Sequence, residues 1–173
     1  MTFLKRSHAM TEKRIFIIMT VVTLLFFSKE VMAQEDPPKP VEITATSQFL
    51  NFGVFTYAAV TGTVTVAPSG SRSASGVVLI NMGTPSAALF NVVASPGTLI
   101  SIVNGPDVVL SCTCLGTMTL HIGTSNPGSP FVTTKDYPDP TLLYIGGTLT
   151  VGNSVSSPPG IYKGTFDLTF SLE

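Results

Sequence analysis

The most reactive side chains in this sequence are two cysteines, Cys112 and Cys114, which are separated by a single residue. On a regular strand, residues two apart are separated by about 6.6 Å with parallel side chains, too far for the Cβ atoms of a disulfide. A bend at Leu115-Gly116 would allow a bridge, and export favours oxidation. Two interpretations stay open: a Cys112–Cys114 disulfide, or two small buried apolar side chains. A redox site normally uses the Cys-x-x-Cys spacing instead.

The order of Cys114, Met118 and His121 is similar to the ligand set of a blue-copper site. Such a site needs two imidazoles beside the thiolate, and His121 is the only histidine after residue 33. His121 also falls on the polar side of a predicted strand, where an exposed side chain is expected. The sequence therefore predicts no metal and no cofactor.

The residues of common hydrolases are also missing. No Gly-x-Ser-x-Gly motif occurs, and three carboxylates stand singly rather than as an acid/base pair. They are Asp107, Asp167 and Glu173. We expect no enzymatic activity and assign no catalytic residues.

Residues 1–33 read as a cleaved secretory signal peptide. Lys5, Arg6, Lys13 and Arg14 precede an apolar run over 15–27, and Ala33 supplies a small residue at the cleavage site. As a helix that run extends about 20 Å, less than the roughly 30 Å of a hydrocarbon core. The true start of the chain is either Met1 or Met10, since both leave basic residues ahead of the apolar run. The alternative is an uncleaved anchor. We expect export to the cell surface, the periplasm or the medium.

The chain after residue 33 is mildly acidic, with Lys39, Arg72, Lys135 and Lys163 as its cations against eight carboxylates. Nucleic-acid binding requires clustered cations that displace counterions from phosphates, so a nucleic-acid partner is not expected. No later apolar run reaches the length of a transmembrane helix, so no membrane span is expected in the mature chain.

Residues 34–40 form a charged, proline-rich flexible leader, and residues 41–173 a single domain of short alternating strands. Turn residues separate these strands, which is typical of an all-β, immunoglobulin-like antiparallel β-sandwich. The predicted strands are Val41–Thr46, a segment with Leu50, Phe52 and Val54, Gly62–Val66, Gly76–Ile80, Ala88–Val92, Thr98–Val103, Asp107–Cys112, Thr117–Ile122, Leu142–Val151 and a last strand from Tyr162 to Leu172.

One predicted connection, Gly123 to Thr141, is long and contains four prolines. Long loops in compact domains often bind ligands, and aromatic rings beside carboxylates suit a sugar, calcium or a partner protein. The candidate binding residues are Phe131, Asp136, Tyr137 and Asp139. A plain surface loop is the competing interpretation, and two acidic residues alone give weak support for calcium.

Several ordered motifs resemble an exported bacterial β-domain family of unknown function, the domain-of-unknown-function family numbered four-four-zero-two. They are Leu50-Asn51-Phe52-Gly53-Val54-Phe55, Gly62-Thr63-Val64-Thr65-Val66, Ala88-Leu89-Phe90-Asn91-Val92, Gly146-Gly147-Thr148-Leu149-Thr150-Val151 and Pro159-Gly160-Ile161-Tyr162-Lys163-Gly164-Thr165-Phe166. The family is similar to fimbrial and spore-coat-protein-U-like subunits of Gram-negative bacteria. The resemblance implies an immunoglobulin-like sandwich at the cell surface, and no catalytic residues. The Cys-Thr-Cys element departs from the family pattern.

An open sandwich suggests a way to assemble, because a free sheet edge accepts a strand from another chain. The leader followed by Val41, Ile43 and Ala45 is a candidate donor strand, and pairing within its own sandwich is the alternative. We expect a non-catalytic fimbria-like structural or adhesion subunit that associates with itself or with other surface subunits. The alternative is a monomeric secreted module that binds carbohydrate or another envelope component. A small outer-membrane barrel fits less well, since the strands are short.

Overall fold

The computed structural model describes residues 37, 39–56 and 60–172 of the chain. The predicted signal peptide lies outside these residues. From Lys39 onward the chain forms one compact unit. Among the described residues the regular elements are all strands and every strand pairing is antiparallel, so the predicted all-β sandwich is confirmed. In the described part of the chain, no helix has the length and apolarity needed to cross a membrane.

The main sheet is built around β11 (Thr141–Val151), the longest strand. One edge of β11 pairs with β9 (Thr117–Asn126). The other edge is shared: its first half pairs with β6 (Ala88–Val93) and its second half with β3 (Gly62–Val66). Three outer strands complete the sheet, each paired with one of these: β1 (Glu42–Ala45) with β6, β4 (Arg72–Ser75) with β3, and β8 (Val108–Ser111) with β9.

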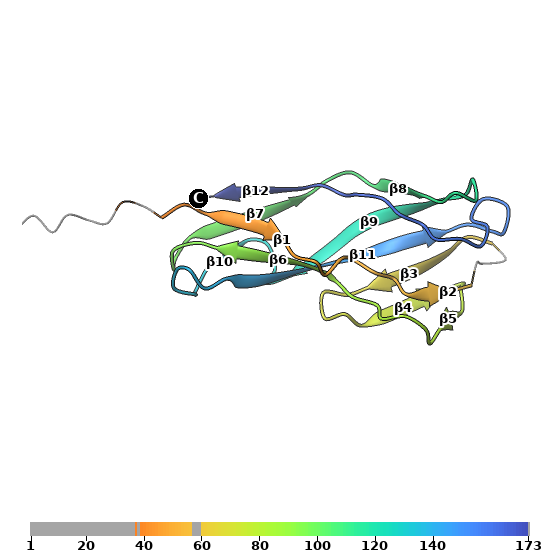
Figure 1. Ribbon diagram of the computed structural model, residues 1–173, viewed down its shortest axis with the longest axis horizontal. Coiled ribbons are helices and arrows are strands. Elements are labelled where there is room, and N and C mark those ends of the chain that lie inside the picture. The colour runs from red at the N-terminus through yellow and green to blue at the C-terminus, as the bar shows by residue number, and fades with distance from the viewer. Residues whose placement is uncertain (1–36, 38, 57–59, 173) are drawn as a thin grey trace, which may run out of the picture. The chain divides into compact units, whose positions relative to one another are not determined.

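Two smaller sheets complete the domain. In the first, β7 (Leu99–Asn104) lies between β10 (Phe131–Val132) and β12 (Leu168–Leu172). In the second, β2 (Val54–Phe55) pairs with β5 (Leu79–Ile80). Figure 1 shows β9 and β11 running through the middle of the domain, while the short strands gather toward its two ends.

The core follows from the period-two pattern of the sequence. In β3, Val64 and Val66 are fully buried while Thr63 and Thr65 are partly exposed on the outer face. In β11 the same alternation buries Leu143, Ile145, Leu149 and Val151. Successive strand residues point to opposite faces, so apolar residues at alternate positions form one continuous layer.

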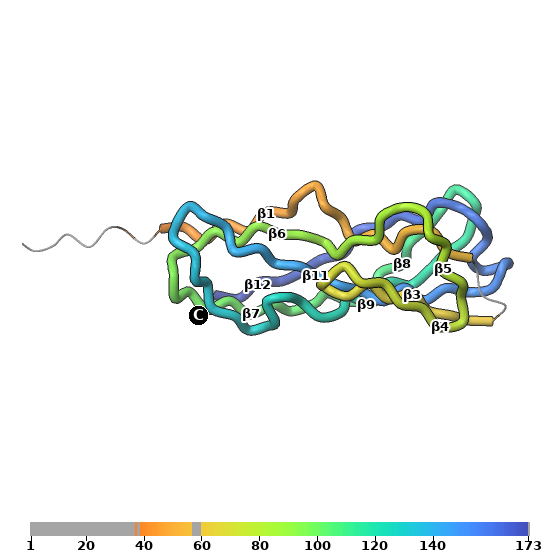
Figure 2. The backbone as a smooth tube through the Cα atoms, turned by 90° about the horizontal axis from the view of Figure 1, so that it is seen from below, coloured from red at the N-terminus to blue at the C-terminus, as the bar shows by residue number. Residues whose placement is uncertain are grey.

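We distinguish two ends of the domain, and both views agree on them (Figures 1 and 2). The β3 end contains β2, β3, β4, β5 and the β8–β9 hairpin. The β1 end contains β1, β6, β7, β10 and β12. The first strand begins and the last strand ends at the β1 end.

Most predicted strands are present, and the differences have physical reasons. Gly62–Val66 is confirmed residue for residue. β4 was not predicted because Arg-Ser-Ala-Ser has no apolar alternation; the hairpin turn after β3, with Gly70 N–H donating to Ala67 C=O (2.8 Å), brings it into place. β12 begins only at Leu168, because nearer Tyr162 the chain forms only an isolated bridge, between Lys163 and Ser111 of β8.

Candidate functional site

The two cysteines lie in the hairpin loop between β8 and β9, not on a strand. The predicted strand through Cys112 is wrong by one residue, since β8 ends at Ser111. Cys112 N–H donates to Gly116 C=O (3.3 Å), which closes the turn. Leu115 turns the chain with a φ of 64°. This bend replaces the extended geometry that would keep the sulfurs apart, and Cys112 and Cys114 form a disulfide with a Cα–Cα distance of 5.1 Å.

The three residues that suggested a copper site do not converge. Met118 is buried in the core, while His121 lies on the outer face of the same strand. His121 Nδ1 lies 2.7 Å from Asp107 Oδ1, and both side chains are more than half exposed. Among the described residues, no group of three or more His, Cys, Asp and Glu side chains could hold a metal ion.

The long connection is shorter than predicted and loses its first candidate ligand-binding residue. β9 extends to Asn126, and β10 interrupts the segment. Phe131 lies in β10 opposite Ile100 and is only 6% exposed, so its ring belongs to the core. Phe131 was therefore wrongly predicted as part of a binding loop, because an apolar residue between prolines gives no sign of a two-residue strand.

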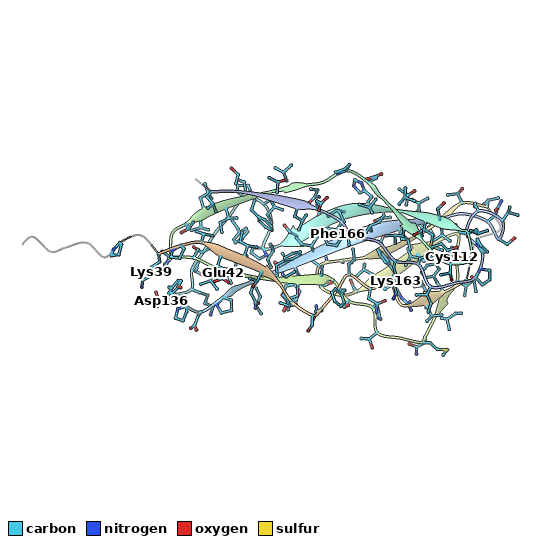
Figure 3. The ribbon with its side chains drawn as sticks, turned by 45° about the horizontal axis from the view of Figure 1, so that its top comes forward. Lys39, Glu42, Cys112, Asp136, Lys163 and Phe166 are labelled. Atoms are coloured by element: carbon cyan, nitrogen blue, oxygen red, sulfur yellow. A yellow bond between two sulfur atoms is a disulfide. The ribbon has the colours of Figure 1, made fainter. Side chains whose placement is uncertain are left out.

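The other loop residues lie at the surface of the β1 end, as the label of Asp136 in Figure 3 indicates. Asp136, Tyr137 and Asp139 are exposed, and Asp139 N–H donates to Asp136 C=O (2.8 Å) in a turn. Lys39 Nζ lies 5.3 Å from the centroid of the Tyr137 ring, a cation–π distance. These contacts brace the loop against the start of β1, and one face of the Tyr137 ring is already occupied by a cation.

The candidate donor strand, β1, pairs with β6 of the same chain over four residues. Val41 and Ile43 pack against the core, whereas Ala45 is exposed. Thr46 N–H donates to Leu89 C=O (3.0 Å). Because hydrogen-bonded and non-hydrogen-bonded pairs alternate along an antiparallel ladder, the main-chain groups of Ile43 and Ala45 point away from β6. Among the described residues, no strand pairs with this outer edge of β1.

A second free strand edge, besides that of β1, lies on β12. Gly105 N–H donates to Asp167 C=O (3.0 Å), in the same register as the β7–β12 ladder. By the same alternation, Thr169 and Ser171 bond to β7, and the main-chain groups of Leu168, Phe170 and Leu172 point outward. The described chain supplies β12 with only one partner, β7.

Apolar side chains between these two edges are only half covered. They pack against the core yet keep partial exposure, unlike the fully buried residues of β3. Phe90 and Phe170 meet edge to face, with ring centroids 6.3 Å apart. This half-buried row consists of Val41, Ile43, Phe90, Phe166, Leu168 and Phe170.

Sequence reasoning predicted β1 as a donor but missed the free edge of β12. The signal was available only in part: the last strand alternates clearly, yet alternation is the same for a strand with one neighbour or two. Which edge stays free depends on strand order, and no local pattern encodes strand order.

Together the layers, the antiparallel ladders and the free outer edges define a β-sandwich domain with open terminal strands. Within that class, the chain belongs to the family described as a domain of unknown function, DUF4402, whose model matches residues 41–171. No curated protein and no solved structure matches the chain.

Proposed function

We propose that this chain is an exported, non-catalytic surface subunit of fimbria-like structural or adhesive function, joined to its neighbours by strand addition. The observation that carries the proposal is that two strands at the β1 end, β1 and β12, each have a free edge longer than the two-residue edge of β10. The predicted signal peptide and the resemblance to fimbrial subunits support export and a surface role.

In this proposal the outer edge of β1 in one subunit pairs with the outer edge of β12 in the next. The donors and acceptors of Ile43 and Ala45 then meet those of Leu168, Phe170 and Leu172, and each subunit keeps its own β1–β6 ladder. The two edges belong to different strands, so the contact is head to tail, and such contacts build open filaments when rotation does not close a ring.

The half-buried row provides apolar surface for this contact. Main-chain hydrogen bonds supply affinity in strand addition, and alternating side chains supply specificity. Covering Ile43, Leu168 and Phe170 removes apolar area from water, which favours association by roughly 25 cal/mol for each Å² buried. An isolated subunit exposes both edges, a condition that natural proteins normally avoid.

The test is a proline substitution at a main-chain position that faces outward. Ala45→Pro removes an N–H that β6 does not use and alters a side chain that is exposed, so we expect a folded monomer that no longer assembles. The sheared surface fraction of the native host, analysed by size exclusion with light scattering, should change from a series of oligomers to a single monomer peak.

A matched control places proline one residue further along, where the main-chain N–H faces β6 instead of outward. Thr46→Pro removes the N–H that donates to Leu89, so it should weaken β1–β6 pairing and lower the melting temperature. Oligomers that persist in a folded Ala45→Pro variant would contradict strand addition through β1. A wild-type protein found only as a monomer would overturn the proposal.

A further inference from the structure

Three of the most exposed aliphatic side chains of the described residues lie on two loops at the β3 end. Leu115, Val155 and Ile161 are 97%, 85% and 79% exposed. Leu115 is in the β8–β9 hairpin loop, and the other two are in the segment that follows β11. Single exposed apolar residues are common on protein surfaces, but a cluster on adjacent loops indicates an interaction site. We call these three residues the apolar tip.

Contacts between the loops bring the backbone beside the three residues together. Thr117 N–H donates to Ser156 C=O (3.0 Å), which joins the hairpin to the residue beside Val155. A Cβ atom at Gly160 would lie 2.6 Å from Cys114 Sγ, so the residue before Ile161 rests directly on the disulfide. Figure 3 shows Cys112 at this end, far from the labelled Lys39 and Asp136.

The stability of the loop does not explain why a leucine occupies position 115. Its φ of 64° lies in the left-handed region, where the Cβ atom of an L-residue is crowded and glycine or asparagine is favoured. Its side chain is almost fully exposed, so it also contributes no core packing. A strained and exposed leucine at the end of a loop suggests a role outside folding.

Much of the backbone of the loops that carry the tip is hydrogen-bonded within or between them. Asn153 Oδ1 accepts hydrogen bonds from Val155 N–H (3.0 Å) and Ser156 N–H (3.1 Å). The hydroxyl of Ser157, only 2% exposed, donates to Thr117 C=O (2.8 Å) and accepts from Gly152 N–H (3.0 Å). Backbone groups paired in this way lower the cost of entering an apolar medium.

Charge is absent from both segments. No Asp, Glu, Lys or Arg occurs from residue 108 to 116 or from residue 141 to 162. The tip also lacks aromatic and arginine side chains, which dominate the energetic centres of protein interfaces. Protruding aliphatic side chains on loops without charged residues match the hydrocarbon boundary of a bilayer better than a pocket on a protein.

We propose that the apolar tip binds a lipid surface by shallow insertion of Leu115, Val155 and Ile161. The disulfide and the Ser157 hydrogen bonds hold the two loops so that the three side chains enter together. The site lies at the end opposite the free edges of β1 and β12, so it acts whether or not subunits assemble.

The test measures flotation of the purified protein with vesicles of zwitterionic phosphatidylcholine. The triple variant Leu115→Ser, Val155→Ser, Ile161→Ser should bind about tenfold more weakly or worse, since each aliphatic side chain adds to partitioning. The control is Val103→Ser, Val109→Ser, Val132→Ser, which removes three other exposed aliphatic side chains (58%, 62% and 51% exposed) and should bind like the wild type.

A second readout uses the absence of tryptophan from the chain. Leu115→Trp introduces a single fluorophore whose emission should shift to shorter wavelength with vesicles, while Val103→Trp should not respond. The proposal would be overturned by a wild type that does not float, by equal binding of the tip and control variants, or by binding that requires anionic lipid and vanishes in salt.

Discussion

β3 and β12 have the same length and the same period-two pattern, yet they differ in burial. β3 lies between β11 and β4, and its Val64 and Val66 have no exposed surface. β12 pairs with β7 alone, and its Leu168 and Phe170 remain partly exposed. Of these two strands, the one with a neighbour on each edge is the one whose apolar side chains are fully buried. β3 is thus suited to stability, whereas under the proposed function the partly exposed side chains of β12 are available for assembly.

The largest predicted effect comes from truncating one leucine to alanine at each end of the domain and comparing the losses of stability. Leu149 lies opposite Val64 and is 2% exposed, so Leu149→Ala should lower the free energy of unfolding by about 2–5 kcal/mol. Leu168→Ala should cost only about 1 kcal/mol, because its side chain is half-buried. Guanidinium denaturation followed by circular dichroism measures both values. Equal losses would show that the two ends are packed alike.

A somewhat smaller effect is expected at Arg72, which attaches the β2–β5 sheet to the β3 end. Its guanidinium donates to the carbonyls of Phe52 (2.9 Å), Val54 (3.1 Å) and Ile80 (2.9 Å). Arg72→Ala leaves these carbonyls without that donor and should cost about 2–3 kcal/mol of unfolding free energy.

Arg72→Lys serves as the matched variant, since an ammonium keeps the charge but not the planar set of donors, and should recover part of the loss. The exposed Lys163→Ala variant should stay within about 0.5 kcal/mol of the wild type. If Arg72→Ala behaves like Lys163→Ala, the small sheet does not depend on this side chain.

The disulfide should contribute less, because it closes a loop of only three residues. The chain-entropy relation gives about 1–2 kcal/mol for so short a loop. Replacing both cysteines with Cys112→Ser and Cys114→Ser should lower stability by that amount and make it insensitive to reductant. A wild type whose unfolding midpoint does not move on reduction would argue that hydrogen bonds alone hold the hairpin.

The smallest effect concerns pH and Tyr162. Its hydroxyl donates to Pro158 C=O (2.7 Å), and desolvation raises the pKa of the phenol above its ordinary value of about 10. The folded chain therefore holds this proton more tightly than the unfolded chain. Stability from this group is complete below pH 10 and is lost as the pH rises through the raised pKa.

Comparing unfolding midpoints of the wild type and Tyr162→Phe from pH 8 to 11 checks this, since Tyr162→Phe lacks the titration while the other tyrosines remain in both. Parallel profiles would show that the phenol titrates alike in the folded and unfolded chains.

Patterns in the sequence predicted much of the fold because alternation is a local property. Gly62–Val66 matches β3, and the predicted strand from Leu142 matches β11 within one residue. Features that depend on distant partners were missed. Ser73 and Ser75 form part of a strand only because β3 supplies a ladder, and Phe131 is buried only because it lies opposite Ile100.

For the candidate site, the sequence predicted which strand could be a donor, with Val41, Ile43 and Ala45 on one apolar face, of which Ala45 is exposed in the structure. It left open where that strand pairs, and the structure places it against β6. The second edge, on β12, followed from the order of strands in the sheets, which no segment reveals by itself.

By itself, the sequence determined that the domain is built of β-strands and which side of each strand is apolar, because adjacent residues of an extended chain must point in opposite directions. It also determined that residues 108–116 and 141–162 contain no Asp, Glu, Lys or Arg. Only the tertiary structure decided how many neighbours each strand has, which main-chain groups remain unpaired, and that the loops of Leu115 and Val155 share one end. Those properties arise from contacts between residues far apart in the chain.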